Sequence, residues 1–197
     1  MVNERIELSH TNQNVTWYPI DYYPWGGDYR PTAQGSIRLV DGKGFYVKMC
    51  CFEKDRQKTH KEPNSPVYED SCMECFVNFY PEESEKYLNF EVNAGGIMLA
   101  QWGIGKTERI SIQELGLDLP QVKLTETSEL WAIQYMIPLS FLKVLYGKCN
   151  ITKGDMIACN FYKCGDMTPH PHYGCSAPIN WEVPNFHLPQ FFEKIIL

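Results

Sequence analysis

The chain has 197 residues, enough for one large domain, and its hydrophobic content of 44% and charged content of 21% are ordinary for a folded globular protein. The net charge of −6 argues against nucleic acid, whose binding depends on neutralising phosphates with Lys and Arg, and gives no basis for docking on an anionic membrane. No stretch of the sequence is long and apolar enough to span a bilayer.

The start of the chain lacks the apolar core of a secretory signal peptide. This indicates either an intracellular protein or a chain from which a leader has been removed, and the sequence leaves the compartment open. The 8 cysteines are even in number but sparse for this length, and Cys50 and Cys51 are adjacent, which suits a disulfide framework poorly. We therefore expect mostly free, buried thiols.

In chain order, residues 1–30 read as an irregular N-terminal segment, because Pro and Gly interrupt its aromatic residues. Residues 35–40 and 45–52 then read as the two strands of a hairpin around an Asp-Gly-Lys-Gly turn. Residues 53–66 are charged and end in two prolines, which predicts a surface loop.

The rest of the chain is dominated by short strands. In order it reads as strands at 72–80, 87–93 and 97–102, a loop-like stretch at 103–128, a strand at 130–137, a short helix at 140–146, a strand at 156–163 and an aperiodic tail. Ser140 and Gly147 would begin and close the helix. The pattern predicts one domain over residues 1–197, an all-β antiparallel sandwich of immunoglobulin or jelly-roll type with one short helix.

The strand at 87–93, Tyr-Leu-Asn-Phe-Glu-Val-Asn, is the most informative segment. Its apolar residues alternate with Tyr87, Asn89, Glu91 and Asn93, and the two sets point to opposite faces of a sheet. An aromatic ring beside amides and a carboxylate suits a ligand rich in hydroxyl groups, because such side chains donate and accept hydrogen bonds. The alternative is an ordinary polar ladder, either exposed or between strands.

Glu74 and Glu91 fall on the non-core faces of strands that we expect to be adjacent. Paired carboxylates are the machinery of glycoside hydrolysis. They also accept hydrogen bonds from sugar hydroxyls, or from Lys and Arg, without doing chemistry. Nothing in the sequence indicates a tuned acid, so binding is favoured over catalysis.

Two candidate metal motifs are weak. Cys72 and Cys75 form a C-x-x-C pair, but residues three apart on a strand point to opposite faces, so their thiolates do not share a zinc ion. His170 and His172 are close enough to act together, yet no third ligand stands at a recognisable spacing. A surface or glycan-contacting role fits this pair better.

Two aromatic residues lie in loops beside the predicted strands. Trp181 belongs to a proline-rich loop and Tyr68 precedes the strand of Glu74, so either ring could stack on a sugar. The alternative for both is packing across the mouth of the sandwich. Trp131 lies in mid-strand among apolar residues and is expected in the core.

Several ordered motifs carry a family resemblance. They are an aromatic and Asp-Ser-x-x-Glu at 68–74, Tyr-x-Asn-x-Glu-x-Asn at 87–93, Asn-Phe-Tyr-Lys-Cys-Gly-Asp at 160–166, a following His, Asn-Trp at 180–181 and Pro-Asn-Phe-His-Leu-Pro at 184–189. From about Ile37 to the C-terminus the chain resembles carbohydrate-binding modules of family 9 and a family 9-like group of bacterial proteins.

The resemblance implies a β-sandwich that binds a terminal sugar of an oligo- or polysaccharide, usually attached to a xylanase or another glycoside hydrolase. In family members two aromatic rings clamp the sugar, and Tyr68 and Trp181 fall nearest to these positions. Glu74 matches the family's acid, whereas Glu91 falls where members tend to have a basic residue, so we expect a different sugar specificity. Calcium is implied as a possible ligand, but the sequence shows no clear cluster for it.

The predicted ligand-binding residues are Tyr68, Glu74, Tyr87, Asn89, Glu91, Asn93, Asn160, Lys163, His172 and Trp181. This set predicts a non-catalytic saccharide-binding module with no cofactor and with a glycoside hydrolase as a possible partner. A glycoside hydrolase using Glu74 and Glu91, or a sandwich with a structural or partner-binding role, is the alternative. The sequence names neither the sugar nor the oligomeric state.

Overall fold

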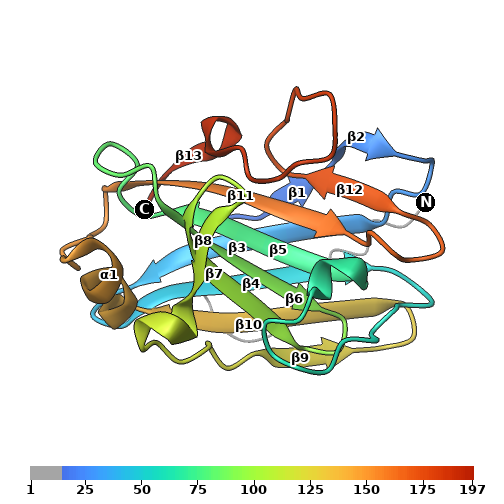
Figure 1. The fold of residues 1–197 in the computed structure, drawn as a ribbon, viewed down its shortest axis with the longest axis horizontal. Coiled ribbons are helices and arrows are strands. Elements are labelled where there is room, and N and C mark those ends of the chain that lie inside the picture. The colour runs from blue at the N-terminus through green and yellow to red at the C-terminus, as the bar shows by residue number, and fades with distance from the viewer. Residues whose placement is uncertain (1–14) are drawn as a thin grey trace.

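The computed structural model describes residues 15–197, which form two antiparallel sheets packed face to face (Figure 1). The five-stranded sheet has the order β1 (Tyr18–Ile20), β3 (Thr32–Val40), β4 (Gly44–Phe52), β10 (Leu130–Pro138) and β9 (Lys123–Glu126). The eight-stranded sheet has the order β2 (Tyr22–Gly26), β12 (His172–Cys175), β11 (Met156–Cys164), β5 (Cys72–Asn78), β6 (Tyr87–Asn93), β7 (Met98–Ile104) and β8 (Glu108–Ser111), with β13 (Glu193–Ile196) also paired to β11.

The prediction of an antiparallel β-sandwich is confirmed. The predicted hairpin and the predicted three-stranded meander are also present. β3 and β4 pair from Thr32↔Phe52 to Val40↔Gly44. Gly44 has a φ of +148°, and a Cβ there would lie 2.0 Å from the carbonyl oxygen of Ile137, so only glycine fits this close approach. β5, β6 and β7 form the predicted three-stranded meander.

Several short strands lie where the sequence predicts irregular structure. β1 and β2 fall within the predicted N-terminal segment, β8 and β9 within the loop-like stretch, and β12 and β13 within the tail. Those predictions were wrong because strands of three to five residues form by pairing with a longer neighbour, not by a periodic pattern of their own. Residues 1–14 of the predicted irregular segment lie outside the described residues.

The short helix is present as α1 (Leu139–Tyr146), and three single 3-10 turns accompany it. Pro138 stands at its N-cap without a side-chain hydrogen bond, so the predicted Ser140 cap is wrong. Gly147 closes the helix in the left-handed conformation, as predicted. Among residues 15–197 no helix is long and apolar enough to cross a membrane.

The centre of the eight-stranded sheet is buried on both faces. Its inner face packs on the five-stranded sheet, with Phe90 and Trp131 in the shared core. Its outer face is covered by the C-terminal segment, residues 176–192, which supplies Ile179 and Leu188. The turn η1 (Val67–Glu69) also covers this face. Every residue of β5 and β6 is consequently buried. The polar face predicted for 87–93 is therefore not an open sheet surface but lies under irregular chain.

Candidate functional site

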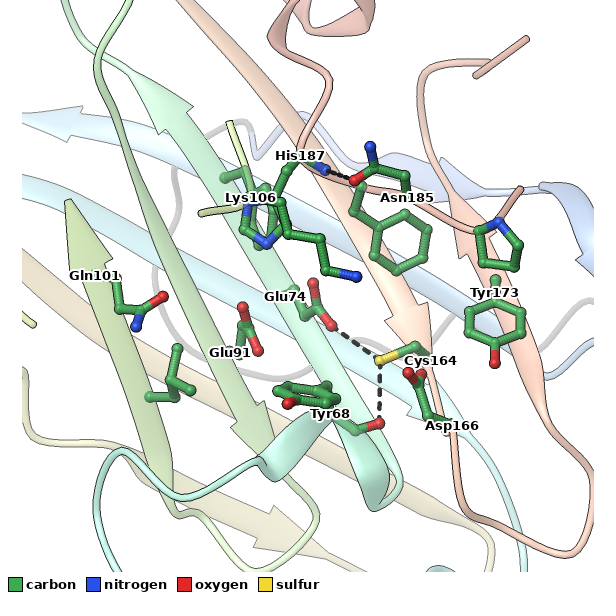
Figure 2. Close-up of a pocket in the computed structure, with 14 residues that line it drawn as sticks. Tyr68, Glu74, Glu91, Gln101, Lys106, Cys164, Asp166, Tyr173, Asn185 and His187 are labelled. Carbon is green, nitrogen blue, oxygen red and sulfur yellow. Dashed lines mark hydrogen bonds between the residues drawn. The ribbon is translucent and has the colours of Figure 1, made fainter. Parts of the chain in front are cut away.

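A pocket of about 310 Å³ opens on the outer face of the eight-stranded sheet, beneath this irregular cover (Figure 2). Three of the predicted ligand-binding residues line it: Tyr68, Glu74 and Glu91. The other lining residues are Phe76, Leu99, Gln101, Lys106, Cys164, Asp166, Tyr173, Pro184, Asn185, Phe186 and His187. The pocket thus combines strands β5, β6, β7 and β11 with the C-terminal segment.

Glu74 and Glu91 form the floor of the pocket. They are direct partners across β5 and β6, and both side chains point into the same space (Figure 2). The Oε1 of Glu91 accepts a hydrogen bond of 2.7 Å from the amide of Asn89, while its buried Oε2 has no partner. The Oε1 of Glu74 accepts a hydrogen bond of 2.9 Å from the thiol of Cys164. The Oε2 of Glu91 can therefore still accept a hydrogen bond from a ligand at this floor.

The acids of the pocket are held toward their neutral forms. Burial raises the pKa of Glu91 to about 7 and that of Asp166 to about 6. Burial, with the Cys164 thiol and Glu91 close by, raises the pKa of Glu74 well above its ordinary value. Among residues 15–197 none of the three forms an ion pair. Lys106, an exposed lining residue, is the cation of the pocket wall.

Aromatic rings form the walls. Tyr68 belongs to η1 and is 39% exposed, and its carbonyl accepts a hydrogen bond of 3.0 Å from the backbone N–H of Asp166. Phe186 stacks on Tyr162 with ring centroids 4.1 Å apart. His187 lies 2.9 Å from the Tyr87 hydroxyl, and burial lowers its pKa to about 3, so it is neutral at physiological pH.

Three more residues of the polar face of β6 are committed to the protein itself. Asn89 accepts a hydrogen bond of 2.9 Å from the guanidinium of Arg109, which lies 4.3 Å from the centre of the Tyr87 ring. Asn93 donates to the carboxylate of Asp70 at 2.9 Å. Although burial opposes it, hydrogen bonds from Thr59, the His60 backbone and Asn93 lower the pKa of Asp70. Tyr87, Asn89 and Asn93 therefore hold the site together and do not line the pocket.

Asn160 has a similar supporting place under the C-terminal segment. Its Oδ1 accepts from the Ser176 hydroxyl at 2.8 Å and from the Ala177 backbone at 2.9 Å, and its amide donates to the Ala177 carbonyl at 3.1 Å. A fully buried side chain with all these bonds has little capacity left for a ligand. Its role is to fix the chain that forms the pocket cover.

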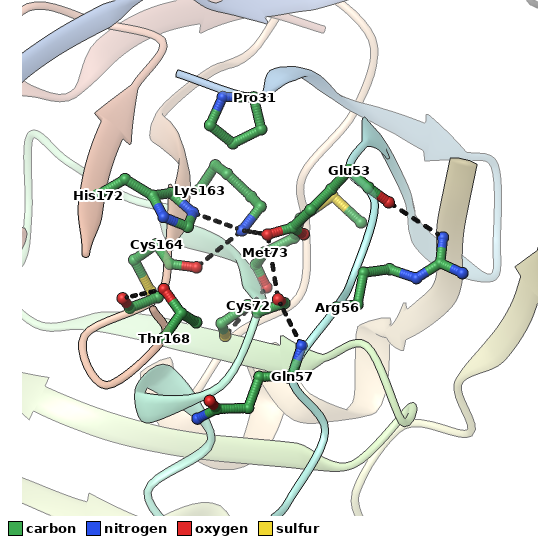
Figure 3. A network of polar contacts seen from close by, with 12 residues as sticks. Pro31, Glu53, Arg56, Gln57, Cys72, Met73, Lys163, Cys164, Thr168 and His172 are labelled. Carbon is green, nitrogen blue, oxygen red and sulfur yellow. Dashed lines mark hydrogen bonds and ion pairs between the residues drawn. The ribbon is translucent and has the colours of Figure 1, made fainter. Parts of the chain in front are cut away.

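Lys163 and His172 lie in a separate polar network, away from the pocket (Figure 3). Lys163 Nζ lies 2.7 Å from the Nε2 of His172, 3.3 Å from a carboxylate oxygen of Glu53 and 2.8 Å from the carbonyl of Cys164. The same Glu53 accepts a hydrogen bond of 3.1 Å from Trp131. Asn160 and Lys163 are three residues apart on β11, so their side chains point to opposite faces.

Trp181, the second predicted clamp ring, does not line the pocket. Its side chain is exposed to 49%, and its carbonyl accepts a hydrogen bond of 2.9 Å from the indole of Trp25. The loop is thus held by its backbone, and the ring points to solvent. Phe186, five residues later, is the C-terminal ring that reaches the pocket.

Most of the lining residues that the sequence prediction misses belong to segments that lack a strand pattern. Phe186 and His187 lie in the Pro-Asn-Phe-His-Leu-Pro motif, and Asp166 ends the motif at 160–166. The period of two could have placed Gln101, because it is the partner of Asn89 across β6 and β7. Lys106 gives no signal of its own.

The cysteines behave as predicted: all are free, and all but Cys149 are buried. Cys72 and Cys75 lie on opposite faces of β5, in different clusters. Among the described residues one group could hold a metal ion, Cys72, Glu74 and Cys164, whose ligand atoms lie within 4.8 Å of one another. Calcium prefers oxygen ligands, so a group with two thiols does not fit it.

The sequence profile of carbohydrate-binding family 9 matches residues 4–197. The chain therefore belongs to carbohydrate-binding family 9, and the predicted resemblance is confirmed. No curated protein matches the chain.

The fold recurs in solved structures. A proposed carbohydrate-binding protein from Bacteroides uniformis shares 28% identity at a TM-score of 0.74, covering 91% of this chain and 85% of its own. A family 9 module from Caldicellulosiruptor kristjanssonii in complex with cellotriose shares 14% identity at a TM-score of 0.64, covering 92% of this chain and 82% of the module. The structure in complex with glucose shares 15% identity at a TM-score of 0.62, covering 92% of this chain and 83% of the module. At these identities the two complexes show the shared fold alone.

Proposed function

We propose that this protein binds the terminal sugar of an oligo- or polysaccharide in the pocket of Tyr68, Glu74 and Glu91. The observation that carries the proposal is the partnerless buried oxygen of Glu91 beside the carboxyl of Glu74. A buried polar atom without a hydrogen bond is costly, and a sugar hydroxyl would supply the missing donor. Family membership and the glucose and cellotriose complexes of two structural neighbours support a saccharide as ligand.

The size and walls of the pocket fit this ligand class. Small-molecule pockets span about 300 to 1,000 Å³, so about 310 Å³ suits one or two sugar rings better than a long chain. The Tyr68 ring offers an apolar face for the C–H side of a sugar. We assign the second wall to Phe186, because its stacking on Tyr162 holds it in place.

The arrangement favours binding over hydrolysis. A glycosidase needs its two carboxyl groups to flank the bond that it cleaves. Glu74 and Glu91 approach a ligand from the same floor, and burial raises the pKa of both, whereas hydrolysis needs one of the pair as an ionised carboxylate. A glycoside hydrolase partner stays a prediction from the family resemblance.

Calorimetric titration of the protein with glucose, cellobiose and cellotriose, beside galactose and xylose, tests the proposal. We expect Tyr68→Ala to weaken binding of the tightest sugar about fivefold or more, taking as a guide the roughly 1 to 3 kcal/mol that a nucleic-acid base gains by stacking on an aromatic side chain. The backbone carbonyl of Tyr68, which carries the structural hydrogen bond, is unaffected by the change.

Trp181→Ala is the matched control, because Trp181 is also a half-exposed loop aromatic. Its affinity should stay within twofold of the unaltered protein. Unchanged binding in Tyr68→Ala together with lost binding in Trp181→Ala would move the site to the loop of Trp181. Absence of binding to every sugar would overturn the proposal, and release of reducing sugar from the oligosaccharides would favour the hydrolase.

A further inference from the structure

Two thiols and a carboxyl group meet at the edge of the pocket, where Glu74 and Cys164 belong to the lining and Cys72 does not. Cys72 and Cys164 are direct partners across β5 and β11, and Glu74 lies two residues along the same face of β5. The two sulfur atoms and a carboxylate oxygen of Glu74 lie within 4.8 Å of one another, and the Cys164 sulfur is 2.9 Å from Glu74. All three residues are at most 2% exposed.

A second observation concerns the charge of the pocket floor. The unpartnered Oε2 of Glu91 is buried and stands on the strand beside Glu74. Two carboxyl groups placed opposite each other repel when both are ionised, and no Lys or Arg in residues 15–197 forms an ion pair with them. A cation bound by Glu74 would offset this repulsion and let the carboxyl of Glu74 ionise.

We propose that Cys72, Cys164 and Glu74 form a binding site for a thiophilic divalent ion of the zinc type. Zinc takes thiolate and carboxylate ligands in tetrahedral geometry, with ligand atoms roughly 3.5 Å apart, and the three ligand atoms here lie within 4.8 Å of one another. Glu74 and Cys164 line the pocket, so the fourth coordination position faces the cavity. Three protein ligands and one open position are the arrangement of an accessible zinc site.

Binding of the ion replaces protons. Each thiol gives up its proton to solvent as its sulfur coordinates, and the carboxyl of Glu74 does the same if it is protonated. No oxidant or reductant is involved. Burial raises the pKa of Cys72 to about 12 and raises the pKa of Cys164 well above its ordinary value, so without an ion both sulfurs stay protonated and unreactive.

A second pair of thiols, Cys75 and Cys159, serves as an internal control for the proposed site. The sulfur atoms of Cys75 and Cys159 lie 3.8 Å apart, on the inner face of the same two strands. That pair lies in the apolar core, and an ion there would have no open position. The proposal therefore predicts metal binding at one thiol pair and not at the other.

The test is a titration of the reduced protein with Co²⁺ alone, followed through the cobalt–thiolate charge-transfer band, with Zn²⁺ as competitor. We expect one equivalent of cobalt to produce the band and one equivalent of zinc to remove it. Cys72→Ser and Cys164→Ser should each lower the band intensity by half or more. Cys159→Ala and Cys149→Ser should leave it unchanged.

Three results would overturn the site: no thiolate band, a band of undiminished intensity in Cys72→Ser, or a band lost in Cys159→Ala. If the serine variants fail to fold, X-ray absorption of the zinc-loaded, unaltered protein decides the question. Two sulfur neighbours at about 2.3 Å with oxygen completing the shell support the proposal, whereas no sulfur or four sulfurs contradict it. These readouts need no sugar, so they are independent of the proposed saccharide site.

Discussion

Two buried polar clusters, one on each face of the eight-stranded sheet, differ in how completely their groups are paired. On the inner face, Glu53 accepts bonds from Ser71 and Trp131 and pairs with Lys163, which also meets His172. On the outer face, Glu91 keeps a buried oxygen with no partner. Proteins pair almost all their buried polar groups, so a closed network indicates structure and an open one indicates a place for a ligand.

This difference explains why residue type alone is a poor guide to function here. Lys163 and His172 have the chemistry of ligand-binding residues, but their bonds are used within the protein. Glu74 and Glu91 are equally buried and yet line a cavity.

Removing the cation of the inner network should be the most damaging change. Lys163→Met leaves Glu53 buried with no opposite charge, and breaking such a pair costs about 3 to 5 kcal/mol in the free energy of unfolding. Urea denaturation of the variant and of the unaltered protein at pH 7 measures this loss of unfolding free energy. A loss below about 1 kcal/mol would show that the network is not the structural cluster that we describe. Sugar affinity of the folded variant should be unchanged.

Acid should weaken the same network through His172. Burial, and then the nearby Lys163, lowers the pKa of this histidine to about 3 from 6.5. As pH falls below 6.5 the unfolded chain takes up a proton that the folded protein refuses, so the contribution of His172 to stability falls by up to about 1.4 kcal/mol per pH unit.

The comparison with His172→Asn isolates this effect, since Glu91 and Asp166 titrate in the opposite sense. The difference in unfolding free energy between the unaltered protein and the variant should fall by about 2 kcal/mol from pH 6.5 to pH 4.5. A difference that stays constant over this range would mean that His172 takes up a proton in the folded state.

Glu91→Gln should separate stability from binding in the pocket. The carboxyl of Glu91 has its pKa raised to about 7 by burial, so its contribution to stability is present below about pH 4.5 and is lost as pH rises through 7. The amide avoids this loss, and at pH 8 the variant should be more stable by about 1 kcal/mol, while its sugar affinity falls. Thermal unfolding at pH 5 and pH 8, with calorimetry, measures both. A variant that is less stable at pH 8 would assign Glu91 a structural role.

The regular part of the fold follows from the sequence because it depends on local periodicity. Alternation in 87–93 correctly places Leu88, Phe90 and Val92 in the core, and the turn at 41–44 correctly joins β3 to β4. The same rule applied to β11 separates Asn160 from Lys163, which the ligand-binding prediction groups together.

The cover of the pocket could not be derived in this way. Residues 176–192 have no strand period, and they are held by long-range contacts such as the hydrogen bonds of Asn160. Arg109 lies in a stretch that reads as loop, yet it fixes Asn89 and the Tyr87 ring. Burial of the polar face is therefore a property of the tertiary structure. For the same reason, the sequence alone does not show which acids have all their hydrogen bonds satisfied within the protein.

A crystal structure with the tightest-binding sugar of the calorimetric panel would decide between the pocket and the exposed loop. The account predicts the sugar in the pocket, with its ring against Tyr68 and a hydroxyl donating to the Oε2 of Glu91. Sugar bound at the exposed Trp181, with the pocket empty, would contradict it.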